Sequence, residues 1–504
     1  MICVMACKAQ PIPQTKKITE KYYPDPELTI NTPAFQKKKG FTSHEELIVF
    51  LEKQTAEHSE IITLSYLGES QKGKKVPMVV LENKTSKEPK VKVWIQGGLH
   101  GNEMGSSESV LYLIDQILNN QEYAYLLNRI VLGIVPMANI DGYEKEDRYA
   151  ANGLDLNRDQ TKLNVQESIF LKQAFSDFKA EVALDFHEYK PYRKDFSSFS
   201  TFGIAGYYDV MFLYSGNLNV PESLRKYTKT RFVSQAQTAL DAAGLSHHDY
   251  ISTTKHLGSI HFNQGSENSR SSATSYALTN CVSSLIEVRG IDLGRTSFKR
   301  RINTAFIIAI SYIKTAYENG AEVKAEIQQA EAAKGEAVLK TKKQVSEQSI
   351  QVIDLDKSEL MNLEVTIRDA LQLTPVNTRA RAAAYLILPE QSAAIEKLKI
   401  LGLEIQVLEK ATEVEVEQYR IETYEQEAEK YEGVNRQTVT AKLELIKKTF
   451  PIGTAIVYMN QSNANLAMEV LEPEVQNSFV TFEVIETKEG DTLPIYRYLK
   501  TEVL

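Results

Sequence analysis

Short apolar runs and amphipathic stretches alternate along the first 320 residues of the chain. The runs RIVLGIV from Arg129 and EVALDF from Glu181 are rich in β-branched and other apolar residues, which is typical of strands buried on both faces. Between them, VQESIFLKQAFSDFK carries apolar side chains on one helical face and predicts an amphipathic helix. This order of elements predicts an α/β fold in which helices flank a mixed, largely parallel twisted sheet.

Signals at the ends of elements refine this prediction. Ser43 and Glu46 have the spacing of a capping box, so we expect a helix to begin there. The runs IITLSYLGES and KKVPMVVLENK are joined by a polar turn at Gly73 and predict an edge hairpin. Residues 190–280 show little periodicity, and we expect binding loops in this stretch.

Changes in composition along the chain divide it into four parts. Residues 1–39 are expected to form a signal-like segment and an extended lead-in, and residues 40–320 the α/β domain, whose last helix is closed by Gly320. Residues 321–350 are rich in Ala, Glu, Lys and Gln and predict a helical connector. Residues 351–504 contain one strand, helix, strand unit and several short alternating runs, which predict a smaller α+β accessory domain.

Overall composition excludes several classes of protein. The 504 residues carry a net charge of -8 and show no basic footprint, so no nucleic-acid partner is expected. After the first residues, no apolar run approaches a length of about 20 residues, which a membrane-spanning helix needs. The three cysteines are too few and too unevenly placed for a disulfide framework or a thiolate zinc site.

The first residues, MICVMACKAQPIPQ, resemble the last part of a bacterial lipoprotein signal, in which a cysteine, here Cys7, is acylated after cleavage. The apolar part is shorter than the about 7 to 15 residues of a complete signal. We therefore expect Met1 to lie inside a longer export signal of a periplasmic, outer-membrane or secreted protein. The alternative is a frayed terminus of a cytoplasmic protein. Membrane attachment is expected only through a lipid on Cys7.

The segment Val91–Leu118 carries the first chemical signal. It consists of an apolar strand, a glycine pair, a polar loop with His100 and Glu103, and an amphipathic helix that Ser106 or Ser107 is expected to cap. With 8 His and 66 acidic residues in the chain, this His and Glu spacing arises about once by chance. The pair therefore has meaning only in its context, which is the end of a predicted strand.

Ligands of open α/β sheets gather at the carboxyl ends of strands, where His100 is expected to lie. Catalytic zinc sites commonly use two histidines and one carboxylate, and leave a coordination position open for water. His187, at the end of the run EVALDFHEY, supplies the second histidine. The sequence therefore predicts a zinc site made by His100, Glu103 and His187.

The segments FTSHEELIVFLEK, GGLHGNEMGSSE, VPMANIDGYE, RYAANGLDLNRD, DFHEY and LIEVRG, in this order, resemble the zinc metallocarboxypeptidase family. The resemblance covers residues 40–320, and the tail of the chain is similar to that of longer bacterial members. It implies a hydrolase with one Zn²⁺ per chain that removes the last residue of peptides with a free C-terminal carboxylate.

The resemblance also implies roles for single residues. His100, Glu103 and His187 match the zinc ligands, and Asp155 matches the carboxylate that orients a ligand histidine. These four residues would form the metal centre.

The remaining roles concern the substrate. Arg158 and Asn157 match the residues that bind its terminal carboxylate, and Arg148 matches the residue that stabilises the oxyanion. Glu287 matches the general base. Digestive members carry a tyrosine before the base that closes over the substrate, and because that neighbourhood lacks one here, we expect Tyr276 to take this part.

Two other functions are compatible with the same residues. One is a related hydrolase, either an amidase on peptidoglycan stem peptides or a deacylase of small acyl amino acids. The other is a catalytically silent protein that binds peptides at the same rim.

Overall fold

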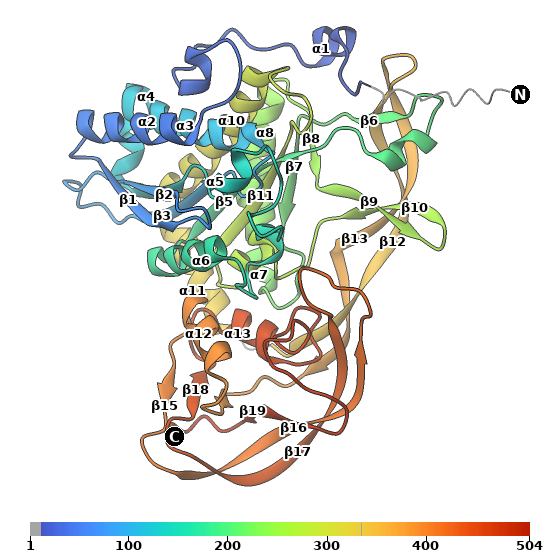
Figure 1. Ribbon diagram of the computed structural model, residues 1–504. Coiled ribbons are helices and arrows are strands. Elements are labelled where there is room, and N and C mark those ends of the chain that lie inside the picture. Colours follow the sequence, from blue (N-terminus) through green and yellow to red (C-terminus); the bar gives the residue numbers. More distant parts are fainter. Residues whose placement is uncertain (1–11, 334) are drawn as a thin grey trace, which may run out of the picture.

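The computed structural model describes residues 12–333 and 335–504 (Figure 1). These residues form an eight-stranded mixed sheet, a five-stranded sheet beside it and a six-stranded sheet in the C-terminal part. The predicted lipid site at Cys7 lies outside the described residues. Within them, no helix combines the length and apolar character that crossing a bilayer requires.

The eight-stranded sheet confirms the predicted fold class. Its four central strands run parallel, and antiparallel strands lie on both sides of them. The predicted edge hairpin is present as its first two strands. In spatial order the strands are β1 (Ile62–Glu69), β2 (Lys75–Leu81), β4 (Ile130–Val135), β3 (Val91–Gly97), β5 (Val182–Tyr189), β11 (Val282–Arg289), β7 (Val210–Tyr214) and β8 (His247–Asp249).

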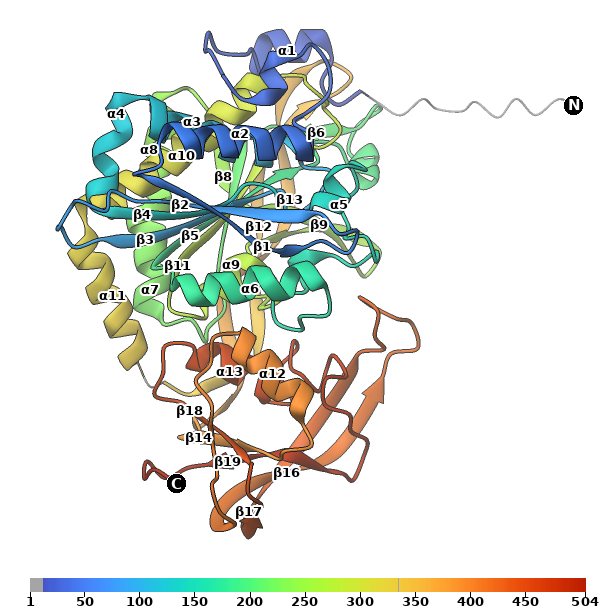
Figure 2. The same ribbon diagram turned by 60° about the vertical axis from the view of Figure 1, so that its left-hand side comes forward.

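Helices cover both faces of this sheet (Figure 2). The central strands are rich in apolar residues, as expected where both faces of a sheet are buried, and the Trp94 ring packs edge-on against Phe175 at 5.7 Å. One face carries α2 (His44–Glu57), α3 (Met104–Asn119), α8 (Ser234–Ala242) and α10 (Phe298–Glu318), and the other carries α6 (Gln166–Phe178) and α9 (Ser272–Ala277). Shorter helices of this domain are α4 (Gln121–Ala124), α5 (Ile140–Tyr143) and α7 (Glu222–Tyr227).

The two predicted helix starts have different outcomes. Helix α2 begins after Ser43 with both bonds of the capping box, which confirms that prediction. The predicted cap of α3 at Ser106 or Ser107 is wrong, because this helix begins at Met104. Ser106 lies inside its first turn, where its Oγ accepts a bond from the Gly98 amide at 2.9 Å and donates one to the Glu103 carbonyl at 2.6 Å. It thereby fixes the helix to the end of β3.

The five-stranded sheet corrects two predictions. Part of the stretch 190–280 is regular, since it supplies three of the five strands. The connector 321–350 is helical only as far as Ala332 and continues as a strand from Ala337, because its polar residues alternate along a ribbon that pairs with the next strand. Its members in spatial order are β6 (Ile204–Gly206), β12 (Ala337–Asp354), β13 (Glu359–Arg379), β10 (Ser259–Gln264) and β9 (Ile251–His256), and α11 (Gly320–Ala332) precedes them in part.

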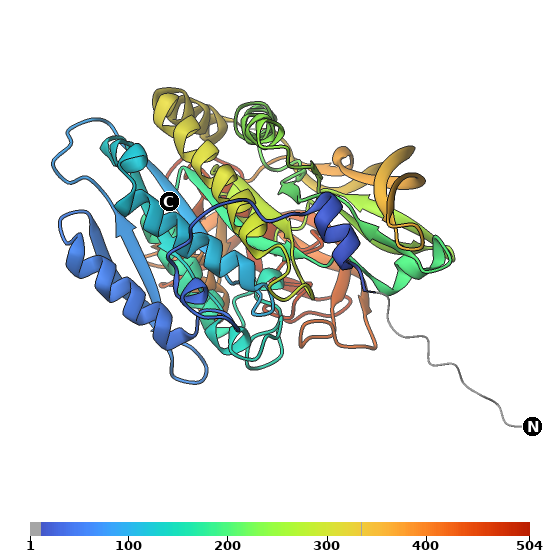
Figure 3. The same ribbon diagram turned by 90° about the horizontal axis from the view of Figure 1, so that it is seen from above.

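The lead-in before residue 40 is not extended throughout. It contains helix α1 (Lys16–Tyr22), which lies beside the ribbon of β12 and β13 (Figure 3). The Tyr22 hydroxyl accepts a bond from the Leu360 amide at 3.2 Å. The lead-in thus packs on a segment more than 300 residues away in the sequence.

The C-terminal part packs on the α6 side of the large sheet (Figures 1 and 2). The hydroxyl of Ser176 in α6 donates a bond to the carbonyl of Ile400 at 3.0 Å. Its strands in spatial order are β15 (Gln406–Val407), β18 (Ala455–Tyr458), β14 (Ala384–Ile387), β19 (Thr492–Tyr498), β16 (Thr412–Gln426) and β17 (Gln437–Phe450). Its helices are α12 (Ser392–Ile400) and α13 (Ala464–Leu471).

Candidate active site

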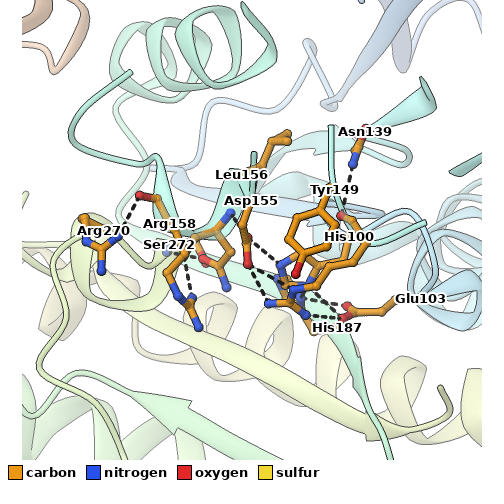
Figure 4. A network of polar contacts seen from close by, with 12 residues as sticks. His100, Glu103, Asn139, Tyr149, Asp155, Leu156, Arg158, His187, Arg270 and Ser272 are labelled. Atoms are coloured by element: carbon orange, nitrogen blue, oxygen red, sulfur yellow. Dashed lines mark hydrogen bonds and ion pairs between the residues drawn. The ribbon is translucent and has the colours of Figure 1, made fainter. Parts of the chain in front are cut away.

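The predicted metal residues come together at the carboxyl ends of β3 and β5 (Figure 4). Nδ1 of His100 lies 2.8 Å from Oε1 of Glu103, and Nδ1 of His187 lies 2.8 Å from Oε2 of the same carboxylate. The two Nδ1 atoms are 3.0 Å apart, and all three side chains are buried. Two nitrogen donors and one oxygen donor thus converge on one point.

Both histidines use their other ring nitrogen to contact a carboxylate. Nε2 of His100 lies 3.0 Å from Oδ1 of Asp155, and Nε2 of His187 lies 2.9 Å from Oδ2 of Asp185. A ring nitrogen held in this way carries the proton and leaves the lone pair of Nδ1 free for a cation. This donor set fits a zinc ion held by His100, Glu103 and His187.

The electrostatics of the cluster agree with this fit. Burial raises the pKa of Glu103, but the two imidazoles outweigh it and hold this pKa far below the usual value. Burial lowers the pKa of His187, and Asp185 and Glu103 outweigh it and raise this pKa well above the usual value. The carboxylates therefore favour positive charge at this point, which a bound cation supplies.

Asp185 was not predicted from the sequence. It lies two residues before His187 in β5, and residues two apart in a strand share a face of the sheet. The spacing of Asp185 and His187 in the run LDFHEY therefore indicated the contact, but the run as a whole resembles an ordinary buried strand.

Arg148 lies beside the metal residues. Its Nε and Nη2 donate to Oδ2 of Asp155 at 3.0 and 2.9 Å, and its Nη1 lies 3.7 Å from Oε1 of Glu103. Burial lowers the pKa of Arg148, but Asp155 and Glu103 outweigh it and raise this pKa. Arg148 therefore stays cationic at the edge of the cluster.

Glu287 lies at the end of β11, paired in register with His187 of β5. Burial first, and then the charge of Glu103, raise the pKa of Glu287 to about 7. A carboxyl group with such a pKa can accept and return a proton near neutral pH.

Asn157 and Arg158 belong to the short 3-10 turn η3 (Leu156–Arg158). The Asn157 amide donates to Oδ1 of Asp155 at 2.8 Å, and its side-chain oxygen accepts from the Ser272 amide at 2.9 Å. Nη1 of Arg158 donates to the Asn157 carbonyl at 2.7 Å. The turn is thus held from both sides.

A cavity of about 430 Å³ joins these residues. His100, Glu103, Arg148, Asn157, Arg158 and Glu287 line it. Strand β12 closes part of it with Ile350 and Val352. A segment assigned from the sequence to the connector and accessory domain therefore forms a wall of the candidate active site.

The prediction that Tyr276 caps the substrate is wrong. Its side chain is only 1% exposed, its hydroxyl donates to Oε1 of Gln96 at 3.0 Å, and its ring stacks on Phe175 at 3.9 Å. Because α9 packs on the α6 side of the sheet, Tyr276 points into the core.

Tyr250 lies in the cavity instead. Its amide donates to the Phe212 carbonyl at 2.8 Å, and its side chain packs against Leu213 and Leu285. No motif marks Tyr250, so only the folding of the stretch 190–280 could reveal it.

The model of a known family, described as zinc carboxypeptidase, matches residues 47–322. The chain belongs to this family. Carboxypeptidase 2 of Trichophyton rubrum is 31% identical over 441 residues, which cover 85% of this chain and 81% of that protein. Carboxypeptidase 2 of Trichophyton equinum is 30% identical over 443 residues, with the same two coverages.

Among solved structures, the carboxypeptidase A of Helicoverpa armigera aligns with a TM-score of 0.44 and 18% identity, covering 57% of this chain and 78% of that one. Membership of the family makes the protein a zinc-dependent metallocarboxypeptidase that acts on peptides. The alternatives, an amidase, a deacylase or a catalytically silent peptide-binding protein, are not favoured.

Proposed function

We propose that the enzyme hydrolyses the last peptide bond of its substrate with a residue assignment centred on Glu287. The observation that carries this proposal is the pairing of Glu287 with His187, which puts a carboxyl group of pKa about 7 beside the three candidate zinc ligands. When bound there, zinc supplies Lewis acidity toward water and the peptide carbonyl. Glu287 takes a proton from the attacking water and returns it to the leaving amine.

Arg158 and Asn157 bind the terminal carboxylate of the peptide in this assignment. Both line the cavity, and the guanidinium is suited to a carboxylate with two oxygens. A substrate bound through its C-terminal carboxylate presents only its last peptide bond to Glu287. This arrangement explains exopeptidase action.

Arg148 stabilises the negative charge that develops on the carbonyl oxygen. Its Nη1 is 3.7 Å from Glu103, so the cation lies at the rim of the metal cluster. Asp155 contacts both Arg148 and His100 and therefore couples the position of the guanidinium to that of the zinc ligand.

The test is a comparison of zinc content and turnover for wild type, Glu287→Gln and His187→Ala. The panel contains blocked dipeptides, wall-derived stem peptides and acyl amino acids, and Glu122→Gln on the surface helix α4 serves as the control. We expect stoichiometric zinc in wild type and Glu287→Gln, dipeptide hydrolysis in wild type and the control, and none in His187→Ala. Full activity of Glu287→Gln would overturn the assignment of the base.

Export of the protein, with or without a lipid on Cys7, stays a prediction from its first residues. Mass spectrometry of a membrane fraction tests it. An acylated Cys7 peptide would support attachment, and a peptide with unmodified Met1 would contradict it.

A further inference from the structure

We propose that the tip of the β16–β17 hairpin, residues 427–436, positions the substrate-binding turn Asp155–Arg158. It would do so through Glu432 and Tyr431. This inference rests on the proposed carboxylate-binding role of Arg158. It assigns the C-terminal part of the chain a role in substrate binding in addition to any contribution to the stability of the fold.

Glu432 holds the first residue of the turn. Its Oε2 accepts a bond from the Asp155 amide at 3.2 Å, and its carbonyl accepts one from Nζ of Lys162 at 3.3 Å. The side chain of Asp155 contacts His100 and Arg148 at the same time. Asp155 therefore joins the chemistry on one side to the C-terminal hairpin on the other.

Tyr431 contributes to the support of the last residue of the turn through Arg270. The Arg270 guanidinium lies 5.1 Å from the centre of the Tyr431 ring and 4.6 Å from that of Phe482. Its Nε donates to Oδ1 of Asn477 at 2.9 Å, and its Nη1 donates to the Arg158 carbonyl at 3.4 Å. Three residues of the C-terminal part thus surround the side chain that holds Arg158.

The conformation of the tip suits this role. Glu432 has a φ of 51° and Gly433 has a φ of 87°, so two successive residues are left-handed. Such a conformation is costly for a residue other than glycine and persists where contacts hold it. Paired bonds between the backbones of Tyr431 and Val434 close the turn at 2.8 and 3.2 Å. The turn therefore presents the Glu432 side chain to Asp155.

The same contacts predict which kinetic constant responds. The tip accepts a bond from the Asp155 amide directly, and it reaches the Arg158 carbonyl only through Arg270. Loss of the support would displace Arg158 relative to the metal cluster, so that the terminal carboxylate of the substrate binds less well. Glu432 bonds to Asp155 only at its backbone amide, so the side-chain contacts of Asp155 with His100 and Arg148 are retained when Glu432 is replaced. We therefore expect KM to rise, with kcat and zinc content little changed.

The experiment compares Glu432→Ala with Glu432→Gln in the full-length zinc-loaded enzyme. Alanine removes the acceptor of the Asp155 bond, whereas glutamine keeps an oxygen acceptor and removes only the charge. With a blocked dipeptide as substrate, we expect KM to rise about tenfold for Glu432→Ala and to stay within about threefold of wild type for Glu432→Gln. Glu429→Gln, exposed in the same tip, is the matched control.

A second pair of variants is independent of Glu432. Tyr431→Ala removes the ring beneath Arg270 and should raise KM. Tyr431→Phe keeps the ring and loses only the long bond of 3.4 Å that the Tyr431 hydroxyl accepts from Nη2 of Arg270, and it should leave KM unchanged. If Glu432→Ala does not fold, the two Tyr431 variants still test whether the tip positions the turn. Arg158→Ala, measured in parallel, tests the function on which the inference rests.

The outcomes separate the two ideas. If Arg158→Ala leaves KM unchanged, the carboxylate-binding role is wrong and the positioning role fails with it. If Arg158→Ala raises KM but folded Glu432→Ala and Tyr431→Ala do not, only the positioning role is wrong. If Glu432→Ala and Tyr431→Ala lower the melting temperature without changing KM, the tip is a purely structural element and the inference is overturned.

Discussion

Glu287 and His187 are direct partners in the parallel register of β11 and β5. Paired residues on neighbouring strands project to the same face of a sheet, so the sheet itself fixes the distance between the proposed base and a proposed zinc ligand. A site built on strands is more rigid than one built on loops. The geometry of proton transfer therefore depends on the core of the domain.

The first prediction concerns the pH dependence of activity. Glu287 must be ionised to act as a base, so kcat/KM should rise as the pH rises through its pKa. Burial and the charge of Glu103 raise that pKa to about 7, and a bound cation would lower it by favouring the carboxylate. The acid limb of the profile should therefore lie at or below pH 7. Glu287→Gln should lower kcat by about 10² to 10⁴ and remove this limb, and a limb that persists in the residual activity would assign it to another group.

The second prediction concerns metal removal. The potential ligand atoms of His100, Glu103 and His187 all lie within 4.8 Å of one another. A chelator should abolish hydrolysis and lower the melting temperature, because an ion that binds only the folded state stabilises it. Added Zn²⁺ should restore both for wild type but not for His187→Ala. Full activity after exhaustive chelation would contradict the assignment.

The third prediction concerns Asp185, which contacts Nε2 of His187 at 2.9 Å. Asp185→Asn should weaken zinc binding about 10-fold to 100-fold, because such carboxylates orient the ligand and raise its basicity. A competition titration with a coloured chelator measures the change. Asp177→Asn, exposed at the end of α6, is the control. An unchanged zinc affinity in Asp185→Asn would show that His187 is oriented by other contacts.

The fourth prediction concerns stability. Lys172 in α6 is buried, its Nζ donates to Oγ of Ser275 at 2.6 Å, and burial lowers its pKa to about 7. The unfolded chain has a lysine pKa of about 10.4 and therefore binds a proton that the folded protein lacks between these two values. The cost of burying Lys172 is thus fully present below pH 7 and is relieved as the pH rises.

Urea unfolding of wild type and Lys172→Met at pH 7 and pH 9 measures this contribution. The free energy of unfolding of wild type should gain about 2 kcal/mol relative to the variant over this range. Lys172→Met should also be the more stable protein at pH 7. Parallel pH dependences for the two proteins would mean that Lys172 is solvated in the folded state.

Much of the fold and site was predictable because the signals are local. The Ser43 capping box and the hairpin around Gly73 depend on residues a few positions apart. The buried strands were recognisable from their apolar runs, and because parallel strands share a carboxyl edge, His100 and His187 could be expected to meet.

The errors arose where the outcome depends on distant partners. A tyrosine is suited to contact a substrate, but helix α9 directs the Tyr276 ring onto the ring of Phe175. The strand that begins at Ala337 consists largely of polar residues that favour a helix. Pairing with β13 outweighs that preference.

The sequence by itself determined the chemistry of the site: two histidines, a glutamate and a second carboxyl group, in strands or in the loop that follows a strand. Only the tertiary structure decided what surrounds them, from Asp185 behind His187 to Glu432 behind Asp155. The physical reason is that strand ends follow from short-range patterns, whereas the support of a side chain depends on which remote segments pack against it.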